Sequence, residues 1–130
     1  MPRHPQMDTN NPVVALCISG SRAELEGRRN DAYALYAQAW TLAQDDYEAC
    51  IAAHYMARTV TDPQEVFRWN QESLHRAEAV NDGRVDSFYP SLYLNMGHSH
   101  ELLGEQAEAE GYYALAAALG VAHQPGSGER

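Results

Sequence analysis

Apolar residues recur at helical spacing through most of the chain, in six segments separated by short polar or glycine-containing breaks. The segments cover about residues 12–26, 31–43, 46–60, 63–80, 90–103 and 105–119. Three begin at Asn11-Pro12, Asp45-Asp46 and Asp62-Pro63, where an Asn or Asp can cap the helix. In the first and last of these, a proline also fits the first turn. The pattern predicts an all-α protein of six antiparallel helices, although Val13–Ile18 taken alone could also be a buried strand.

Two stretches of the chain repeat the same five residues at successive intervals of 7, 5, 4 and 3 positions. These residues are Gly20, Gly27, Ala32, Tyr36 and Ala39 in one stretch, and Gly97, Gly104, Ala109, Tyr113 and Ala116 in the other. The second glycine can take the left-handed conformation that ends a helix, and the first lets that helix pass close to its partner. The Ala-Tyr-Ala set lies on one face of the following helix, as a ridge for close packing.

A weaker third copy is expected between these two. Adding 34 to the first set gives His54, Thr61, Val66, Asn70 and Ser73, so histidine and asparagine replace the small residue and the tyrosine. The step from His54 to Gly97 is 43 residues, which leaves about nine inserted residues, and 81–89 is the candidate segment.

The spacing resembles the tetratricopeptide repeat, a helix–turn–helix unit of about 34 residues. The resemblance covers roughly residues 13–122, with repeats at about 13–46, 47–80 and 90–122. It implies three helical hairpins in a short right-handed α-solenoid, and it overrules the strand interpretation of Val13–Ile18. Residues 12–122 are then a single domain, with a disordered segment before it (1–11) and a flexible tail after it (123–130). Within the insert we expect one turn of helix and then a break, because Pro90 disfavours the helical conformation of Tyr89.

The charge is strongly acidic, with 18 Asp and Glu against 9 basic residues, all of them arginine, and a net charge of −9. Such a chain repels a phosphate backbone, so we expect no nucleic-acid partner. An acidic surface can serve solubility alone or favour a basic peptide. No apolar run approaches the length of a membrane span and the N-terminus lacks a signal-peptide core, so we expect a cytoplasmic protein without membrane contact. Cys17 and Cys50 fall in apolar helical runs and are expected to be reduced structural thiols.

Catalytic or metal chemistry has little support in the sequence. His98-Ser99-His100 is the one cluster that invites it, but residues two apart on a helix point in nearly opposite directions. His98 and Glu101 could share an ion only with help from other helices. No metalloprotease, phosphate-loop or nucleophile-elbow motif is present, so we expect no enzyme activity, no metal and no cofactor.

The family resemblance implies a different use, in which the first helix of each hairpin lines a concave groove that holds a peptide or a helix of another protein. Carried onto this sequence, the groove positions are Cys17, Ile51 and Leu94, then Ser21, Tyr55 and His98, then Glu24, Arg58 and Glu101, with Asn95 and Leu102 beside them. Tyr55 and His98 could equally pack between neighbouring hairpins. The chain has no lysine, so the version of the family that clamps a peptide carboxylate with lysine is not expected.

A structural role is the alternative function. Tyr112, Leu115 and Leu119 form a second apolar stripe on the last helix, apart from the stripe that faces its hairpin partner. With no further helix expected to cover it, this stripe could bury itself against a second copy in a two-fold dimer, or fold under the fifth helix or the tail.

Overall fold

The computed structural model describes residues 9–120, which form six α-helices and one 3₁₀ turn. The elements are α1 (Pro12–Leu25), α2 (Arg29–Leu42), α3 (Asp46–Thr59), α4 (Pro63–Ala79), η1 (Asp86–Phe88), α5 (Tyr89–Leu102) and α6 (Gln106–Ala118). No strand occurs in this range, so the prediction of an all-helical protein is confirmed. The predicted helix bounds agree with the observed ones to within two residues.

Side-chain caps begin three of the helices, as the sequence predicted. The carboxamide of Asn11 accepts from the Val13 amide at 2.8 Å, and Asp45 accepts from the Glu48 amide at 2.8 Å. Asp62 accepts from the backbone amide of Glu65 at 3.1 Å. Each cap satisfies an amide that has no partner inside the helix, which is why these helices begin where they do.

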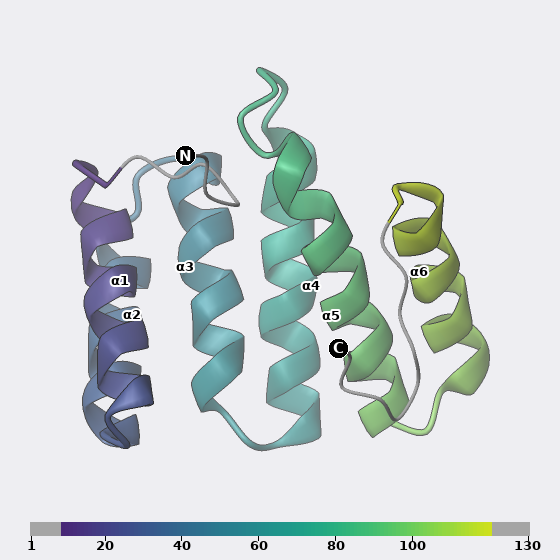
Figure 1. The fold of residues 1–130 in the computed structure, drawn as a ribbon, viewed down its shortest axis with the longest axis horizontal. Coiled ribbons are helices and arrows are strands. Elements are labelled where there is room, and N and C mark those ends of the chain that lie inside the picture. Colours follow the sequence, from purple (N-terminus) through teal and green to yellow (C-terminus); the bar gives the residue numbers. More distant parts are fainter. Residues whose placement is uncertain (1–8, 121–130) are drawn as a thin grey trace.

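In the view of Figure 1, α1 and α2 overlap at one end of the molecule, α3, α4 and α5 follow across it, and α6 lies at the other end. The helices that contact each other most extensively are α1 with α2, α3 with α4, and α5 with α6. We call these the first, second and third helix pairs. In the first and third pairs the connection turns at Gly27 and Gly104, whose φ angles of +79° and +77° favour glycine. No helix within residues 9–120 is long and apolar enough to cross a membrane.

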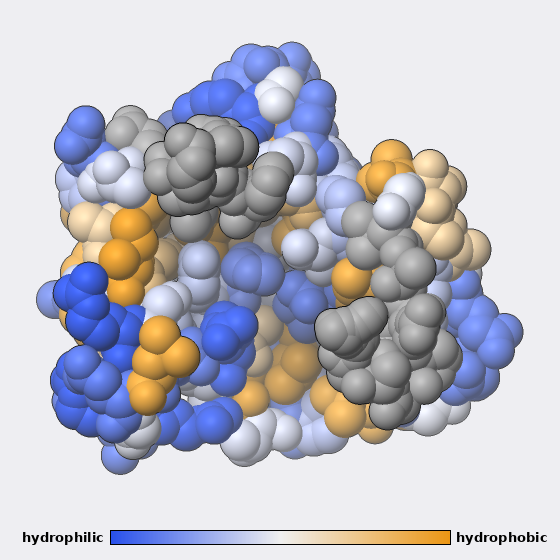
Figure 2. Space-filling model, in the orientation of Figure 1, coloured by the Kyte–Doolittle hydropathy of each residue, from blue (hydrophilic) through white to orange (hydrophobic). Residues whose placement is uncertain are grey.

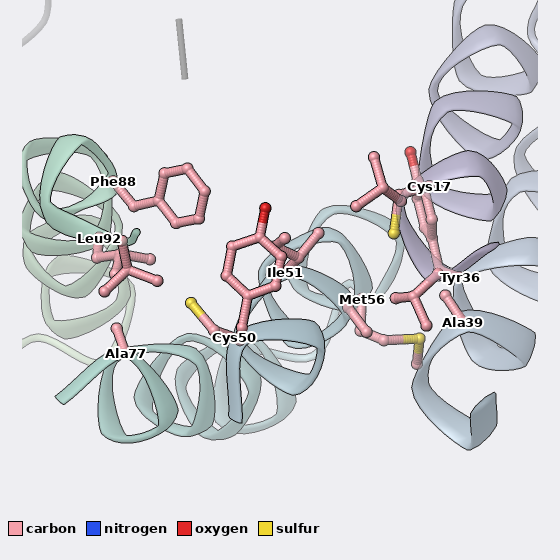
Figure 3. Packing of buried hydrophobic residues seen from close by; sticks show 14 of the residues in the cluster. Cys17, Tyr36, Ala39, Cys50, Ile51, Met56, Ala77, Phe88 and Leu92 are labelled. Atoms are coloured by element: carbon pink, nitrogen blue, oxygen red, sulfur yellow. The ribbon is translucent and has the colours of Figure 1, made fainter. Parts of the chain in front are cut away.

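One continuous core runs through the helices from α1 to α5 (Figure 3). Small residues let the helices approach closely, and Ala32, Ala39 and Ala77 are fully buried. Larger side chains such as Met56 and Leu92 fill the space between the pairs. Cys17 and Cys50 are buried free thiols within this core, and burial raises the pKa of Cys17 to about 12.

The insert differs from its prediction at one point. Residues 86–88 form the expected turn of helix, but α5 follows directly at Tyr89 without a break. Tyr89 is helical, with φ −56° and ψ −41°, although Pro90 comes next. Pro90 lies in the first turn of α5, where its missing amide costs no hydrogen bond. Phe88 is buried in the core and holds the turn against the helices.

The structure describes only part of the two ends of the chain. The predicted disorder of residues 1–8 and the predicted flexible tail at 123–130 lie outside the described residues. Asn11 is the last residue of the segment 1–11, and the sequence also predicted it as the cap of the first helix. It caps α1, and its Nδ2 donates to Glu48 Oε2 of α3 at 2.8 Å.

Candidate interaction surface

The first helices of the three pairs, α1, α3 and α5, meet on one side of the molecule. Between α1 and α3, Arg58 Nε donates to Glu24 Oε1 at 2.8 Å. Between α3 and α5, Asn95 Nδ2 lies 3.2 Å from His54 Nδ1. We call this surface the first-helix face. Figure 2 shows hydrophilic and hydrophobic side chains interspersed on the side of the molecule that it displays.

The structure places the predicted groove residues at three levels of exposure. Arg58, His98 and Leu102 are exposed; Ser21, Glu24, Tyr55, Leu94, Asn95 and Glu101 are partly buried; Cys17 and Ile51 are buried. Cys17 and Ile51 are both buried in the core, so they expose almost no surface to a bound peptide. Cys17 was assigned to the groove from its position in the repeat. That position indicates the helix face on which the residue lies, but not how deeply the next helix covers the residue.

Glu24 is the electrostatic centre of the contact between the first and second pairs. Its Oε1 accepts from the hydroxyl of Tyr36 at 2.6 Å and from Arg58 Nε at 2.8 Å. Burial opposes ionisation of Glu24, but the hydrogen bonds from Arg58 and Tyr36 outweigh it and lower the pKa of this carboxyl. The ring of Tyr55 packs on Tyr36 with centroids 5.3 Å apart. Tyr55 therefore does pack between pairs, and it still keeps part of its surface exposed.

A matching arrangement occurs in the third pair. The hydroxyl of Tyr113 donates to Glu101 Oε1 at 2.7 Å. The ring of His98 lies edge-on to Tyr113 with centroids 5.7 Å apart, and its Nδ1 lies 3.3 Å from the tyrosine hydroxyl. The repeat spacing that aligns Tyr36 with Tyr113 also aligns Glu24 with Glu101, the carboxylates to which these tyrosines donate.

A small pocket lies where α3 meets η1 and α5. Its volume is about 70 Å³, and it is lined by Cys50, Ile51, His54, Tyr55, Phe88, Ser91 and Leu92. Small-molecule sites usually measure at least about 300 Å³. The pocket is also smaller than the cavities of about 150 Å³ that take benzene. Its size therefore suits one aliphatic side chain of a bound segment.

Buried polar side chains of α4 make hydrogen bonds to α5 and to α3, and the sequence analysis missed both sets of contacts. Asn70 Nδ2 donates to Ser99 Oγ at 2.7 Å, and Ser99 Oγ donates to the Asn95 carbonyl at 2.8 Å. Ser73 Oγ donates to the Cys50 carbonyl at 2.8 Å. The sequence did carry a sign of these contacts. Asn70 and Ser73 stand where the outer copies have tyrosine and alanine, and this difference was taken only as a weaker match to the repeat.

Nothing in the described residues assembles a metal centre. No three His, Cys, Asp or Glu side chains within residues 9–120 gather so that they could hold an ion. His98 and His100 have different surroundings, since His98 is exposed and His100 is buried. His100 is buried, stacks on Tyr112 with centroids 5.5 Å apart and lies 2.7 Å through Nδ1 from Glu105 Oε1.

The second stripe of α6 is only partly exposed. Leu115 and Leu119 keep 46% and 52% of their surface, which makes them available to a partner. Tyr112 is partly buried, because it packs against His100 and against the ring of Tyr93 at 6.2 Å. The apolar area that this stripe exposes is therefore smaller than the full surface of its three side chains.

Comparisons with known proteins gave no match: no family model, no curated protein and no solved structure matches this chain.

Proposed function

We propose that this protein is a non-catalytic interaction module whose helix pairs form three antiparallel hairpins of a tetratricopeptide-like, right-handed array. The repeated Gly-Gly-Ala-Tyr-Ala spacing supports the proposal, together with the close packing of α1 with α2, α3 with α4 and α5 with α6. The first-helix face would bind an extended or helical segment of another protein.

The observation that carries this proposal is the continuity of the first-helix face. The contacts Glu24–Arg58 and His54–Asn95 join α1, α3 and α5 on one side, and the 70 Å³ pocket beside Tyr55 opens there. An apolar side chain of the ligand would enter the pocket, while polar neighbours contact its backbone. The net charge of −9 favours a ligand with basic residues through electrostatic attraction.

The proposal can be tested with peptides selected from a displayed random library against the full chain. Ser91→Phe, which fills the mouth of the pocket without removing core packing, should weaken the selected peptide at least tenfold. Ser87→Phe is the matched control, since Ser87 is exposed on η1 and does not line the pocket. Binding of a basic peptide should also weaken as salt rises.

Two further variants test the predicted groove residues. Tyr55→Ala and His98→Ala should reduce affinity while the chain stays folded by circular dichroism, and Arg68→Ala, at an exposed position of α4, should not. Equal losses from all three variants would count against a site on the first-helix face.

A second candidate function is self-association through α6, which the exposure of Leu115 and Leu119 favours. Light scattering at tens of micromolar compares wild type with the Leu115→Glu/Leu119→Glu variant. A dimer that the two charges convert to monomer supports this function. A wild type that is already monomeric refutes it.

A further inference from the structure

The pocket between α3, η1 and α5 combines an apolar interior with neutral polar groups. Three of its seven lining residues, His54, Tyr55 and Ser91, can donate a hydrogen bond through nitrogen or oxygen. The other four are apolar: Cys50, Ile51, Phe88 and Leu92. None of the seven carries a carboxylate or a guanidinium group, although the chain has 18 acidic residues. The lining therefore suits an uncharged group that has an apolar part and a hydrogen-bond acceptor.

His54 is held in one of its two neutral forms by Asn95. The ring is neutral at pH 7, because burial, with a smaller contribution from the charge of Arg58, lowers the pKa of His54 to about 4. Its Nδ1 lies 3.2 Å from Asn95 Nδ2, and an amide nitrogen can only donate. Nδ1 therefore accepts, which leaves the ring proton on Nε2.

The Nε2–H group of His54 is a donor that the fold leaves available. Within residues 9–120 no hydrogen bond is made by His54 Nε2. The ring is partly buried and lines the pocket, so a segment bound there would exclude water from it. A donor that loses water without gaining an acceptor weakens binding, so the best ligand is one that brings an acceptor to this nitrogen.

The volume of the pocket limits the side chain that enters it. At about 70 Å³ it has less than half the volume of the cavities of about 150 Å³ that take benzene, so an aromatic ring is too large. A leucine or valine side chain is small enough, and the nearest acceptor that such a residue brings is its own backbone carbonyl. A free carboxylate is a poorer acceptor here, because the net charge of the chain is −9 and Glu24 already pairs with Arg58 at 2.8 Å.

We propose that the pocket binds a leucine or valine within a peptide segment, and that the backbone carbonyl of this residue accepts a hydrogen bond from His54 Nε2. The ligand is then recognised by an aliphatic side chain together with a neutral amide. An aromatic side chain fails the first requirement and a terminal carboxylate fails the second. This inference rests on the proposed function and specifies which part of the bound segment its pocket recognises.

The first test examines the pocket alone with a small probe. N-acetyl-leucine N-methylamide, which has one aliphatic side chain between two amide groups, is titrated into the full chain labelled with ¹⁵N-histidine, and NMR follows the ring nitrogens. Without the probe, His54 should be in the Nε2–H form, and the probe should then shift its Nε2 resonance saturably. Comparison with His54→Gln identifies this resonance. His75, at an exposed position of α4, provides a ring that should not shift.

Two matched probes separate the two requirements. N-acetyl-phenylalanine N-methylamide keeps the backbone and enlarges the side chain, whereas N-acetyl-leucine keeps the side chain and replaces the second amide with a carboxylate. Each should bind at least fivefold more weakly than the leucine amide. Equal affinities of the three probes would overturn the proposal. So would a spectrum of the free protein in which the ring proton of His54 is on Nδ1.

Protein variants test the donor itself, with binding followed through the NMR signals of the leucine amide. Glutamine can accept from Asn95 and still donate through its own amide nitrogen, so His54→Gln should bind within threefold of wild type. His54→Met is of similar length and has no N–H donor, and it should lose at least tenfold. His75→Met is the matched control and should bind as wild type does. Equal binding by wild type and His54→Met would overturn the proposal.

Peptides selected from the random library distinguish this inference from the proposed function. They should share a leucine or valine at one position. An ester in place of the amide bond after that residue weakens the carbonyl as an acceptor, so it should reduce affinity for wild type and leave the affinity for His54→Met unchanged. Peptides that Ser91→Phe weakens, but that show no preference for an aliphatic residue and no effect of the ester, would uphold the proposed function and overturn this inference.

Discussion

Gly20 lies directly beneath the aromatic ring of Tyr36, so closely that a methyl group on Gly20 would overlap three of the ring carbons. The same relationship holds between Gly97 and Tyr113. Glycine at these positions has no conformational role, since neither residue has a positive φ. It leaves the space that the tyrosine ring of the second helix fills, and this packing fixes how closely the helices of each outer pair approach.

Gly20→Ala should therefore destabilise the protein by about 1–3 kcal/mol, because the ring of Tyr36 is fully buried and cannot move away. Gly97→Ala should cost less, since Tyr113 is only partly buried and can shift. Urea unfolding followed by circular dichroism measures both.

Gly111→Ala provides the control for these glycine variants. Gly111 is exposed within α6, and a methyl group there would meet nothing within 4 Å. Alanine has the higher helix propensity, so this variant should gain about 0.5–1 kcal/mol. A Gly20→Ala protein that also gained stability would show that the Tyr36 ring does not depend on this space.

Replacing each of the two tyrosines with alanine should destabilise the protein by a different amount, because Tyr36 is more deeply buried than Tyr113. Tyr36→Ala should cost about 3–5 kcal/mol, as for other buried aromatic residues. Tyr113→Ala should cost about 1–2 kcal/mol less, because more of its ring is already exposed to water. The comparison is made in urea at neutral pH, where equal losses would mean that the two pairs are packed alike.

The helices were predictable because each one carries local signals. Asn11, Asp45 and Asp62 mark starts, and Gly27 and Gly104 mark ends, so bounds follow from residues that act on their own neighbours. The close pairing of helices followed from the repeated spacing. Neither depends on knowing the contacts between distant parts of the chain.

The interaction surface was less predictable for the opposite reason. Repeat positions placed Tyr55 and Arg58 in the predicted groove, but they did not show that Arg58 pairs with Glu24 across 34 residues. The sequence placed Cys17 in an apolar helical run, but it could not show that this residue is fully covered, because that depends on how far α3 covers α1. The asparagine network around Asn70 was missed because a polar residue at a core position has meaning only once its partner, Ser99 on α5, is known.

The contribution of the Asn70–Ser99 hydrogen bond to stability should be measurable. Asn70→Ala removes the donor to Ser99 Oγ and leaves a buried hydroxyl with one partner fewer, which should cost about 1–3 kcal/mol. Gln71→Ala, at the next and exposed position of α4, should change stability by less than about 0.5 kcal/mol. A loss for Asn70→Ala as small as that of the control would mean that water replaces the missing amide.

The stability of the fold should also depend on the protonation of His54. Burial of the ring, with a smaller contribution from the nearby charge of Arg58, lowers the pKa of His54 from 6.5 to about 4. Between these two values the unfolded chain binds a proton that the folded chain does not. The stabilising contribution is therefore complete above pH 6.5 and is lost as the pH falls toward 4. The shift corresponds to roughly 3 kcal/mol at most.

The measurement compares wild type with His54→Gln, which cannot take up the proton but can still contact Asn95. The free energies of unfolding in urea are determined at pH 7 and pH 4.5, and other titrating groups largely cancel in the difference between the two proteins. Wild type should lose about 2–3 kcal/mol relative to His54→Gln over this range. His75→Gln, at an exposed position of α4, should follow the wild-type profile. A constant difference between wild type and His54→Gln would show that the folded protein protonates His54 as readily as the unfolded chain does.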